Sequence, residues 1–456
     1  GEVSVSEKDL EKCSKCKSIN IKQDEDSLDT WYSSGMWIFS TLGWPDTYRN
    51  NKKSGDLKKF HPTQVLETGY EIITLWVSRM IMMSLFALEE IPFENVYLHG
   101  MVLDGEGKKM SKSKGNGIDP LIMISKFGTD AVRLSLLIGS TPGNDIRLSE
   151  EKIEGQRNFV NKLWNISRYI LAFSENKKEN GGLFAKDNRQ KMTASDKWIS
   201  VKVKKLIEEV TKDIEDYNFS VAGEKMKEFT WNDLADWYIE ASKFSQSEIS
   251  GQLLRVILSD LLKLWHPYLP FVTEKIWNHY NDNMLMVETW ADKDKYEELA
   301  DDSEGEDFEI IKDIIIAIRN IRAENKVDVG KKIKVQIVSK AHSDKIEKNK
   351  ELISRLRTGI EEIEVLEEGK AQEDAIVVTL KDIDIYIIGA IDKEKEKERI
   401  KKEIDKLNKF KRVIEKKLDN EQFVSNAPEE IIEKEKIKKK ELAIRLEKLE
   451  EQMNTL

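Results

Sequence analysis

Residues 109–116 read Lys-Met-Ser-Lys-Ser-Lys-Gly-Asn, and this run decides how the first third of the chain folds. It follows residues 96–103, whose Val, Tyr and Leu favour a β-strand, and a Gly-rich turn at residues 104–107. It precedes Asp119–Pro120, which supply an N-cap and a proline for the first position of a helix. Together with aromatic-rich apolar segments, this order predicts an alternating α/β layer over residues 1–148.

The run at residues 109–116, called the lysine loop below, has the composition of a phosphate site. A lysine is a compact point charge that can follow a triphosphate as it breaks, and the Ser111 and Ser113 hydroxyls can donate hydrogen bonds to phosphate oxygens. Lysines near glycines also suit an ordinary basic surface loop. Composition alone leaves both interpretations open.

The length and charge of the whole chain limit the possible classes of protein. A chain of 456 residues, 39% hydrophobic and 35% charged, is expected to form several domains. The formal net charge of -10 argues against a surface that is basic throughout. A nucleic-acid partner would therefore need a local basic stripe.

The cysteines and the apolar segments indicate a reducing, aqueous compartment. Only Cys13 and Cys16 are present, so a secreted disulfide framework is not supported and the cytoplasm is the expected location. The most apolar stretch, residues 72–88, is interrupted by Ser78 and Arg79. We therefore expect a soluble protein with no membrane partner.

Periodicity predicts a multidomain α/β plus all-α protein. Residues 149–300 show apolar spacings of three and four with few β signals, which predicts a helix bundle. Residues 301–390 are expected to form a small α/β module that starts with a helix over residues 308–325. Strands are expected in that module at residues 333–338, 375–380 and 383–388.

The last part, residues 391–456, has the pattern of an antiparallel coiled-coil hairpin. Lys and Arg outnumber acidic residues between positions 394 and 440, and Asn426-Ala427-Pro428 suits a turn between two helices. A charged coiled coil that dimerises is the alternative. The expected apolar seams are Ile400, Ile404, Leu407, Ile414 and Leu418 in the first helix, and Leu442, Leu446, Leu449 and Met453 in the second.

Many segments resemble the class I aminoacyl-tRNA synthetases, and the valine enzymes among them. The lysine loop matches the signature loop of that family letter for letter. The similarity follows the order of the family over essentially the whole chain. The segments that carry it are residues 23–34, 40–45, 68–72, 75–80, 98–100, 109–116, 119–120, 127–133, 157–165 and 420–428.

The resemblance implies roles for individual residues. Lys112, helped by Lys109, is expected to stabilise the charge that develops on pyrophosphate as the valine carboxylate attacks the α-phosphate of ATP. Trp31 and Ile72 are expected to wall a small apolar pocket for the amino acid, although both also suit an ordinary core. The implied ATP contacts are Gly69, Glu71, His99, Val102, Ser111, Lys112 and Ser113.

Three positions depart from the pattern of the family. Glu71 stands where Asp is usual, which puts its contact with the ribose in question. Gly35 stands where Ala is commoner. Gly117 replaces a β-branched residue after the lysine loop and should loosen the exit of the loop.

The resemblance also implies the fold and the partners. Residues 1–148 are expected to be the C-terminal half of a Rossmann-like catalytic domain, residues 149–300 an anticodon-binding bundle, and residues 391–456 a tRNA-binding arm. The implied partners are L-valine, ATP with Mg²⁺, and tRNA(Val), and the intact enzyme is expected to be a monomer. Cys13 and Cys16 supply half of a structural Zn²⁺ site, which a second cysteine pair in the intact enzyme would complete.

Some features of the family are not found in this sequence. No His-Ile-Gly-His-like segment occurs, and the chain begins at Gly1, so the first half of the catalytic domain and the editing domain are expected to be missing. The isolated chain is then expected to be inactive, to self-associate and still to bind tRNA. The alternatives are a tRNA-binding fragment without chemistry and an isoleucine-type enzyme, in which the positions of Ser33 and Ile72 usually differ.

Overall fold

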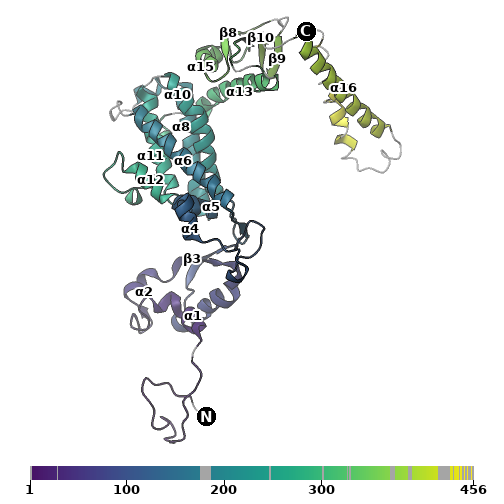
Figure 1. Ribbon diagram of the computed structural model, residues 1–456. Helices are drawn as coiled ribbons and strands as arrows, with labels where there is room; N and C mark the ends of the chain where they lie inside the picture. The colour runs from purple at the N-terminus through teal and green to yellow at the C-terminus, as the bar shows by residue number, and fades with distance from the viewer. Residues whose placement is uncertain are drawn as a thin grey trace. The chain divides into compact units, whose positions relative to one another are not determined.

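The computed structural model forms two compact units, one made of residues 1–157 with 214–221 and one of residues 158–213 with 222–456 (Figure 1). The structure describes residues 3–27, 29–174, 186–245, 248–299, 302–325, 327, 330–369, 375–388, 393–419, 432–434, 436–440, 442–443, 446, 449 and 453.

The first unit contains parallel strands and flanking helices. Strand β3 (Thr63–Gly69) pairs in parallel with β4 (Phe93–His99), so that Gly69 lies opposite His99 at their carboxyl ends. Strand β5 (Val102–Leu103) pairs in parallel with β6 (Ile146–Arg147). The other elements of this unit are α1 (Thr30–Ser40), β1 (Tyr48–Arg49), β2 (Lys52–Lys53), α2 (Gly55–Phe60), η1 (Tyr70–Ile72), η2 (Ile73–Val77), α3 (Ser78–Leu88), η3 (Lys112–Lys114), α4 (Pro120–Phe127) and α5 (Thr129–Leu137).

The prediction of one continuous strand over residues 96–103 is wrong at Gly100. The strand breaks between β4 and β5, where a Cβ on Gly100 would lie 1.7 Å from the Asn144 carbonyl oxygen. The backbone of residues 143–148 runs beside the break, because Gly143 N donates to Leu98 O at 2.8 Å and Ile146 N donates to Met101 O at 2.9 Å. Only glycine permits this close approach.

Local signals set the helices near the lysine loop as expected. Asp119 Oδ1 accepts a hydrogen bond from Leu121 N at 2.8 Å, and Pro120 occupies the first turn of α4. Gly128 follows α4 with a φ of 88°, which favours glycine. The predicted N-cap and proline are confirmed.

A single described stretch, Tyr70–Leu88, is long and apolar enough to cross a membrane by length and composition, with 22% of its window buried. One such stretch is weak evidence, since core helices pass the same test. It passes from 3₁₀ to π to α geometry and packs against α1, with Val77 and Met80 in the core. The absence of a membrane partner stays a prediction.

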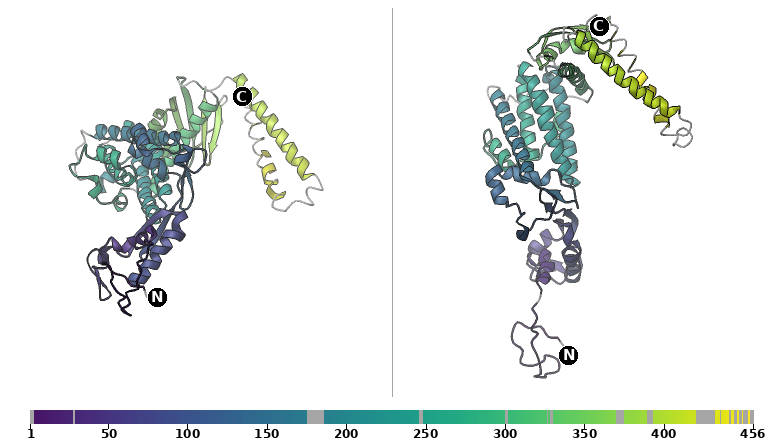
Figure 2. Two further views of the ribbon diagram at one scale, coloured as in Figure 1. Left: turned by 60° about the horizontal axis from the view of Figure 1, so that its bottom comes forward. Right: turned by 45° about the vertical axis from the view of Figure 1, so that its right-hand side comes forward.

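The second unit begins with a bundle of helices, as the apolar spacing predicted. Phe159 of α6 (Glu150–Ser174) lies 5.0 Å from Trp265 of α11 (Glu248–Trp265), ring centre to ring centre. Figure 2 shows these helices side by side. The remaining helices are α7 (Lys186–Arg189), α8 (Ala194–Glu215), α9 (Phe219–Glu228), η4 (Phe229–Tyr238), α10 (Ile239–Ser245), α12 (Pro270–Trp277), η5 (Leu285–Val287) and η6 (Asp294–Tyr296).

A small α/β module follows the bundle. Helix α13 (Asp302–Glu324) precedes a four-stranded sheet of order β8-β7-β10-β9. The predicted strands are confirmed as β7 (Ile333–Val338), β9 (Ala375–Leu380) and β10 (Ile383–Ile388). The sequence interpretation missed α14 (Ser343–Lys348), α15 (Lys350–Arg355) and β8 (Ile360–Leu366).

The described C-terminal residues pack as an antiparallel pair. Ile400 and Ile404 of α16 (Lys393–Leu418) bury their side chains in one cluster with Leu446. The ion pair between Glu415 and Lys439, at 3.3 Å, fits two helical segments that run in opposite directions. The predicted turn at Asn426-Ala427-Pro428 lies outside the described residues.

Candidate active site

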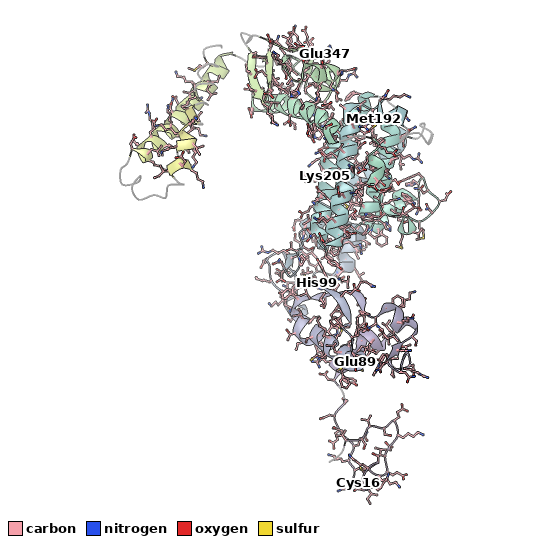
Figure 3. The ribbon with its side chains drawn as sticks, turned by 180° about the vertical axis from the view of Figure 1, so that it is seen from behind. Cys16, Glu89, His99, Met192, Lys205 and Glu347 are labelled. Atoms are coloured by element: carbon pink, nitrogen blue, oxygen red, sulfur yellow. The ribbon has the colours of Figure 1, made fainter. Side chains whose placement is uncertain are left out.

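The carboxyl ends of β3 and β4 bring two of the predicted ATP contacts together. A Cβ on Gly69 would lie 3.6 Å from His99 Cε1, so the bare backbone of Gly69 faces the imidazole. The ring is oriented by Gly100 O, 2.9 Å from Nδ1, and by Glu67 Oε1, 3.3 Å from Nε2. Figure 3 labels His99 at this strand end. Ligands of parallel α/β sheets bind at such ends.

Two residues without a predicted role hold the lysine loop in shape. Asn116 Nδ2 donates to Asp104 Oδ2 at 2.7 Å, and Asn116 Oδ1 accepts from Ser111 N at 3.0 Å. Asp104 Oδ1 also accepts from the backbone N–H groups of Lys108 and Glu106. The Lys108 N–H and then the Asn116 amide lower the pKa of Asp104. In the sequence, the Asp104-Gly105 turn and the Asn at the end of the lysine loop are the features from which these contacts could have been predicted.

The lysine loop meets the segment after β3 through one ion pair. Lys109 Nζ lies 3.5 Å from Glu71 Oε2, and both side chains are exposed. Ser111 Oγ and Ser113 Oγ are 3.2 Å apart. Lys112 begins the short helix η3, but its side chain lies outside the described part of the structure. Glu71 stands where the family usually has Asp, and its side chain contacts Lys109 of the lysine loop.

A further acidic residue, missed from the sequence, ties neighbouring strand ends together. Asp145 Oδ1 accepts a 2.7 Å hydrogen bond from Met101 N, between β4 and β5. The charge of the same carboxylate raises the pKa of the Tyr70 phenol, next to Gly69. Asp145 therefore holds the backbone between β4 and β5, beside the predicted adenine site. Half-buried Val102 follows directly in β5.

The predicted amino-acid pocket is assembled only in part. Trp31 lies in the first turn of α1, whose N-cap is Asp29, and the Arg79 guanidinium carbon lies 5.5 Å from the centre of the Trp31 ring. A Cβ on Gly35 would approach Arg79 Cγ to 3.0 Å, so glycine makes room for this arginine. Ile72 is half-buried at the end of η1. That Trp31 and Ile72 line the same amino-acid pocket remains a prediction.

The cysteine pair forms a tight turn but does not make a complete metal site. Cys16 N donates to Cys13 Sγ at 3.5 Å, with Cys13 buried and Cys16 exposed (Figure 3). Among the described residues, no group of three or more His, Cys, Asp or Glu side chains is placed to hold a metal. A structural zinc ion takes four protein ligands, so these two sulfurs do not fit it by themselves.

Three family models match consecutive parts of the chain. Residues 2–149 match "tRNA synthetases class I (I, L, M and V)". Residues 196–337 match the anticodon-binding domain of tRNA ligase. Residues 392–456 match the "Valyl tRNA synthetase tRNA binding arm".

Relatives match the chain along its whole length. The valine–tRNA ligase of Clostridium acetobutylicum is 39% identical over 100% of this chain and 52% of its own length, and that of Clostridium tetani is 41% identical with the same coverage. The enzyme of Thermotoga maritima is 38% identical over 99% of this chain and 51% of its own length. The chain thus spans about half the length of these relatives.

A solved structure shares the fold. A LeuRS–tRNA–LeuAMS complex from Agrobacterium radiobacter K84 superposes with a TM-score of 0.51 and 22% identity, over 72% of this chain and 36% of that one. The first part of the chain is a Rossmann-like catalytic fragment and the bundle is an anticodon-binding domain. The chain therefore belongs to the class I aminoacyl-tRNA synthetase family and is similar along its whole length to valine–tRNA ligases.

Proposed function

We propose that this chain works in an enzyme that attaches L-valine to tRNA(Val) at the expense of ATP, through a valyl-adenylate. The observation that carries the proposal is the lysine loop, tied to Asp104 through Asn116 and meeting Glu71 beside the strand ends. The likeness to valine–tRNA ligases over the whole chain supports valine as the amino acid.

The proposal divides the work among four parts of the chain, in a monomer acting in the cytoplasm. Residues 1–148 contribute the lysine loop and part of the amino-acid pocket to activation in the enzyme that contains this chain, and residues 149–300 bind the anticodon end of the tRNA. Residues 301–390 connect these to residues 391–456, which bind the outer corner of the tRNA. The models matched at residues 2–149 and 392–456 support the roles of the first and last parts, whereas the anticodon-binding model covers residues 196–337 and so continues past residue 300.

In the first step, a carboxylate oxygen of valine attacks the α-phosphorus of ATP. The bond between that phosphorus and the bridging oxygen of pyrophosphate breaks, and the negative charge moves onto the leaving pyrophosphate. Lys112 and Lys109 stabilise this charge, which is where electrostatic help lowers the barrier. The Lys109–Glu71 contact is solvent-exposed, so its exchange for a phosphate oxygen costs little.

In the second step, a ribose hydroxyl at the 3′ end of the tRNA attacks the carbonyl carbon of the adenylate, and AMP leaves. The remaining residues at the strand ends position the nucleotide throughout. Gly69 gives close backbone approach, Glu71 lies toward the ribose, and the backbone of His99 and Val102 frames adenine. Ser111 and Ser113 donate to phosphate oxygens.

Mg²⁺ is proposed to arrive with the triphosphate, because this ion is usually held by one or two carboxylates and substrate phosphates. Zn²⁺ would bind Cys13 and Cys16 only with two ligands from elsewhere.

The amino-acid pocket is assigned to Trp31 and Ile72, where a flat ring and a β-branched wall leave room for valine and crowd isoleucine.

Valine-dependent exchange of pyrophosphate into ATP and charging of tRNA(Val), measured with the enzyme that contains this chain, test the proposal. We expect both reactions with valine and much weaker activation of isoleucine. A preference for isoleucine and tRNA(Ile) would support the isoleucine-type alternative. tRNA binding without either reaction would support a tRNA-binding role without chemistry.

A further inference from the structure

The side chain of Arg79 lies directly against the backbone of helix α1. Helices α1 and α3 share a core that includes Phe39 and Met80. At Gly35 of α1, a Cβ would lie 3.0 Å from Arg79 Cγ and 3.1 Å from Arg79 Cδ, which is closer than ordinary van der Waals contact. The arginine stem can therefore take this path only because Gly35 has no side chain.

The head of the same side chain lies over the predicted pocket residue Trp31. Trp31 and Gly35 are four residues apart, so they lie on one face of α1, one turn from each other. The Arg79 stem contacts this face at Gly35, and the guanidinium carbon lies 5.5 Å from the centre of the Trp31 ring. A cation at this distance is attracted by the π-face of an indole. The Trp31 ring thus has a fixed partner from α3.

Arg79 is itself held in place without an acidic partner. Its Nε donates to Leu75 O at 3.2 Å, one turn earlier in the chain. Among the residues that the structure describes, no carboxylate forms an ion pair with Arg79. The Leu75 carbonyl and the Trp31 ring therefore direct the guanidinium. Ile72, the second predicted pocket residue, ends the 3₁₀ turn that leads into the same helical stretch.

We propose that Arg79 is a positioning residue for amino-acid selection, which holds the Trp31 ring in a set place relative to Ile72, while Gly35 makes room for its stem. The inference rests on the proposed function, in which Trp31 and Ile72 line the valine pocket. A pocket rejects one extra methylene only if its walls do not move, because overpacking is the sole penalty that it can impose. An indole held by a guanidinium moves less than a free one.

Arg79 could instead bind the carboxylate of the amino acid. Its loss would then weaken the use of valine and isoleucine equally, since both carry the same carboxylate. An arginine needed only for folding would also affect the two amino acids alike. The ratio of kcat/KM for valine to kcat/KM for isoleucine therefore separates positioning from both alternatives.

Pyrophosphate exchange with the enzyme that contains this chain measures this ratio. Arg79→Met keeps the stem and removes the cation, and it should lower the ratio about two- to fivefold, the size of a half-exposed cation–π contact. Arg79→Lys keeps a cation and should retain most of the ratio. Arg49→Met removes an exposed guanidinium from β1 and is the matched control. An unchanged ratio in Arg79→Met, with or without an equal loss for both amino acids, would overturn the proposal.

A double-mutant cycle between Gly35 and Arg79 tests the path of the stem. Gly35→Ala places a methyl group against Arg79 and should lower the ratio, because the stem must move by a few tenths of an ångström. The same alanine should leave the ratio unchanged in Arg79→Ala, which has no stem to displace. An equal effect of Gly35→Ala in both backgrounds would come from helix α1 alone and would contradict the role of Arg79.

Fluorine NMR of the full chain labelled with 5-fluorotryptophan follows the ring without any reaction. The chain has 11 tryptophans, and the Trp31 signal is the one missing from Trp31→Phe. That signal should shift in Arg79→Met and stay in place in Arg49→Met, and an unmoved signal in Arg79→Met would refute the contact. A shift with an unchanged ratio would contradict only the role of Arg79 in selection. A shift with no valine activation by the unaltered enzyme would contradict the proposed function.

Discussion

Asn116 and Asp104 form a clamp across the lysine loop: the Asn116 amide nitrogen donates to the Asp104 carboxylate at 2.7 Å, while the amide oxygen accepts from Ser111 N at 3.0 Å. One side chain thereby fixes the exit of the loop to the turn that precedes it. The loop has a defined shape although its surroundings are exposed, and its Lys109 ammonium group lies 3.5 Å from the Glu71 carboxylate.

Asn116→Ala should open the loop. The hydrogen bonds it removes contribute about 0.5–1.5 kcal/mol each, so the open population should rise about tenfold or more. Limited trypsin digestion followed by mass spectrometry would show this as faster cleavage after Lys109, Lys112 and Lys114. Asn95→Ala, which removes a single exposed bond to Gln64 O, is the control. Equal cleavage rates in the two variants would mean that the clamp does not order the loop.

In the intact enzyme that contains this chain, Lys112→Ala should slow amino-acid activation far more than it weakens valine binding. Its charge is needed mainly when pyrophosphate departs, so its loss raises the barrier and leaves the ground state nearly unchanged. Pyrophosphate-exchange kinetics would show a fall in kcat of about two orders of magnitude or more. Lys58→Ala on α2 is a control for the loss of one surface charge. A raised KM for ATP with unchanged kcat would make Lys112 an anchor for the substrate.

Ile72→Ala should enlarge the amino-acid pocket. Discrimination against isoleucine should then fall by about 1–3 kcal/mol, the usual range for a methylene-sized difference. The measurement is the ratio of kcat/KM for valine and isoleucine in pyrophosphate exchange. Ile73→Ala changes an exposed neighbour and should leave the ratio intact. If neither variant alters it, Ile72 is an ordinary core residue.

Glu309→Gln should destabilise the second unit in a pH-dependent way. Burial of Glu309 opposes its ionisation, but hydrogen bonds from Lys202 and Trp198 and the charge of Lys312 outweigh it and lower the pKa from 4.5 to about 2. The carboxylate therefore contributes stability above pH 4.5, which is lost as the pH falls toward 2. Allowing for partial exposure, the loss at neutral pH should be about 1–2 kcal/mol.

Thermal unfolding at neutral and acidic pH, followed by tryptophan fluorescence, tests the Glu309 prediction. The gap in Tm between Glu309→Gln and the unaltered chain should narrow as the pH approaches 2. Glu306→Gln changes an exposed acid on the same helix and should show little effect at any pH. A gap that stays constant with pH would show that packing, not the charge of Glu309, is responsible.

Signals that lie within a few residues of each other were sufficient for much of the fold. Asp119–Pro120 set the start of α4 because an N-cap and a proline act on the adjacent backbone. Strands β7, β9 and β10 follow from apolar alternation. Strand β8 was missed because its three glutamates hide the pattern. Two of them have partners on the neighbouring strand β7: Glu362 forms an ion pair with Lys334, and Glu364 accepts a hydrogen bond from Gln336.

The sequence by itself determined the family, the lysine loop and the residue types of the site, because these are matters of order and spacing along the chain. The tertiary structure alone decided which of them meet. Lys109 reaches Glu71 across 38 positions, and Asp145 reaches Met101 across 44. Such contacts exist because parallel strands align their carboxyl ends, and Gly100 lets the next segment pass close by. Pairing of strands depends on the whole layer, so no local pattern specifies it.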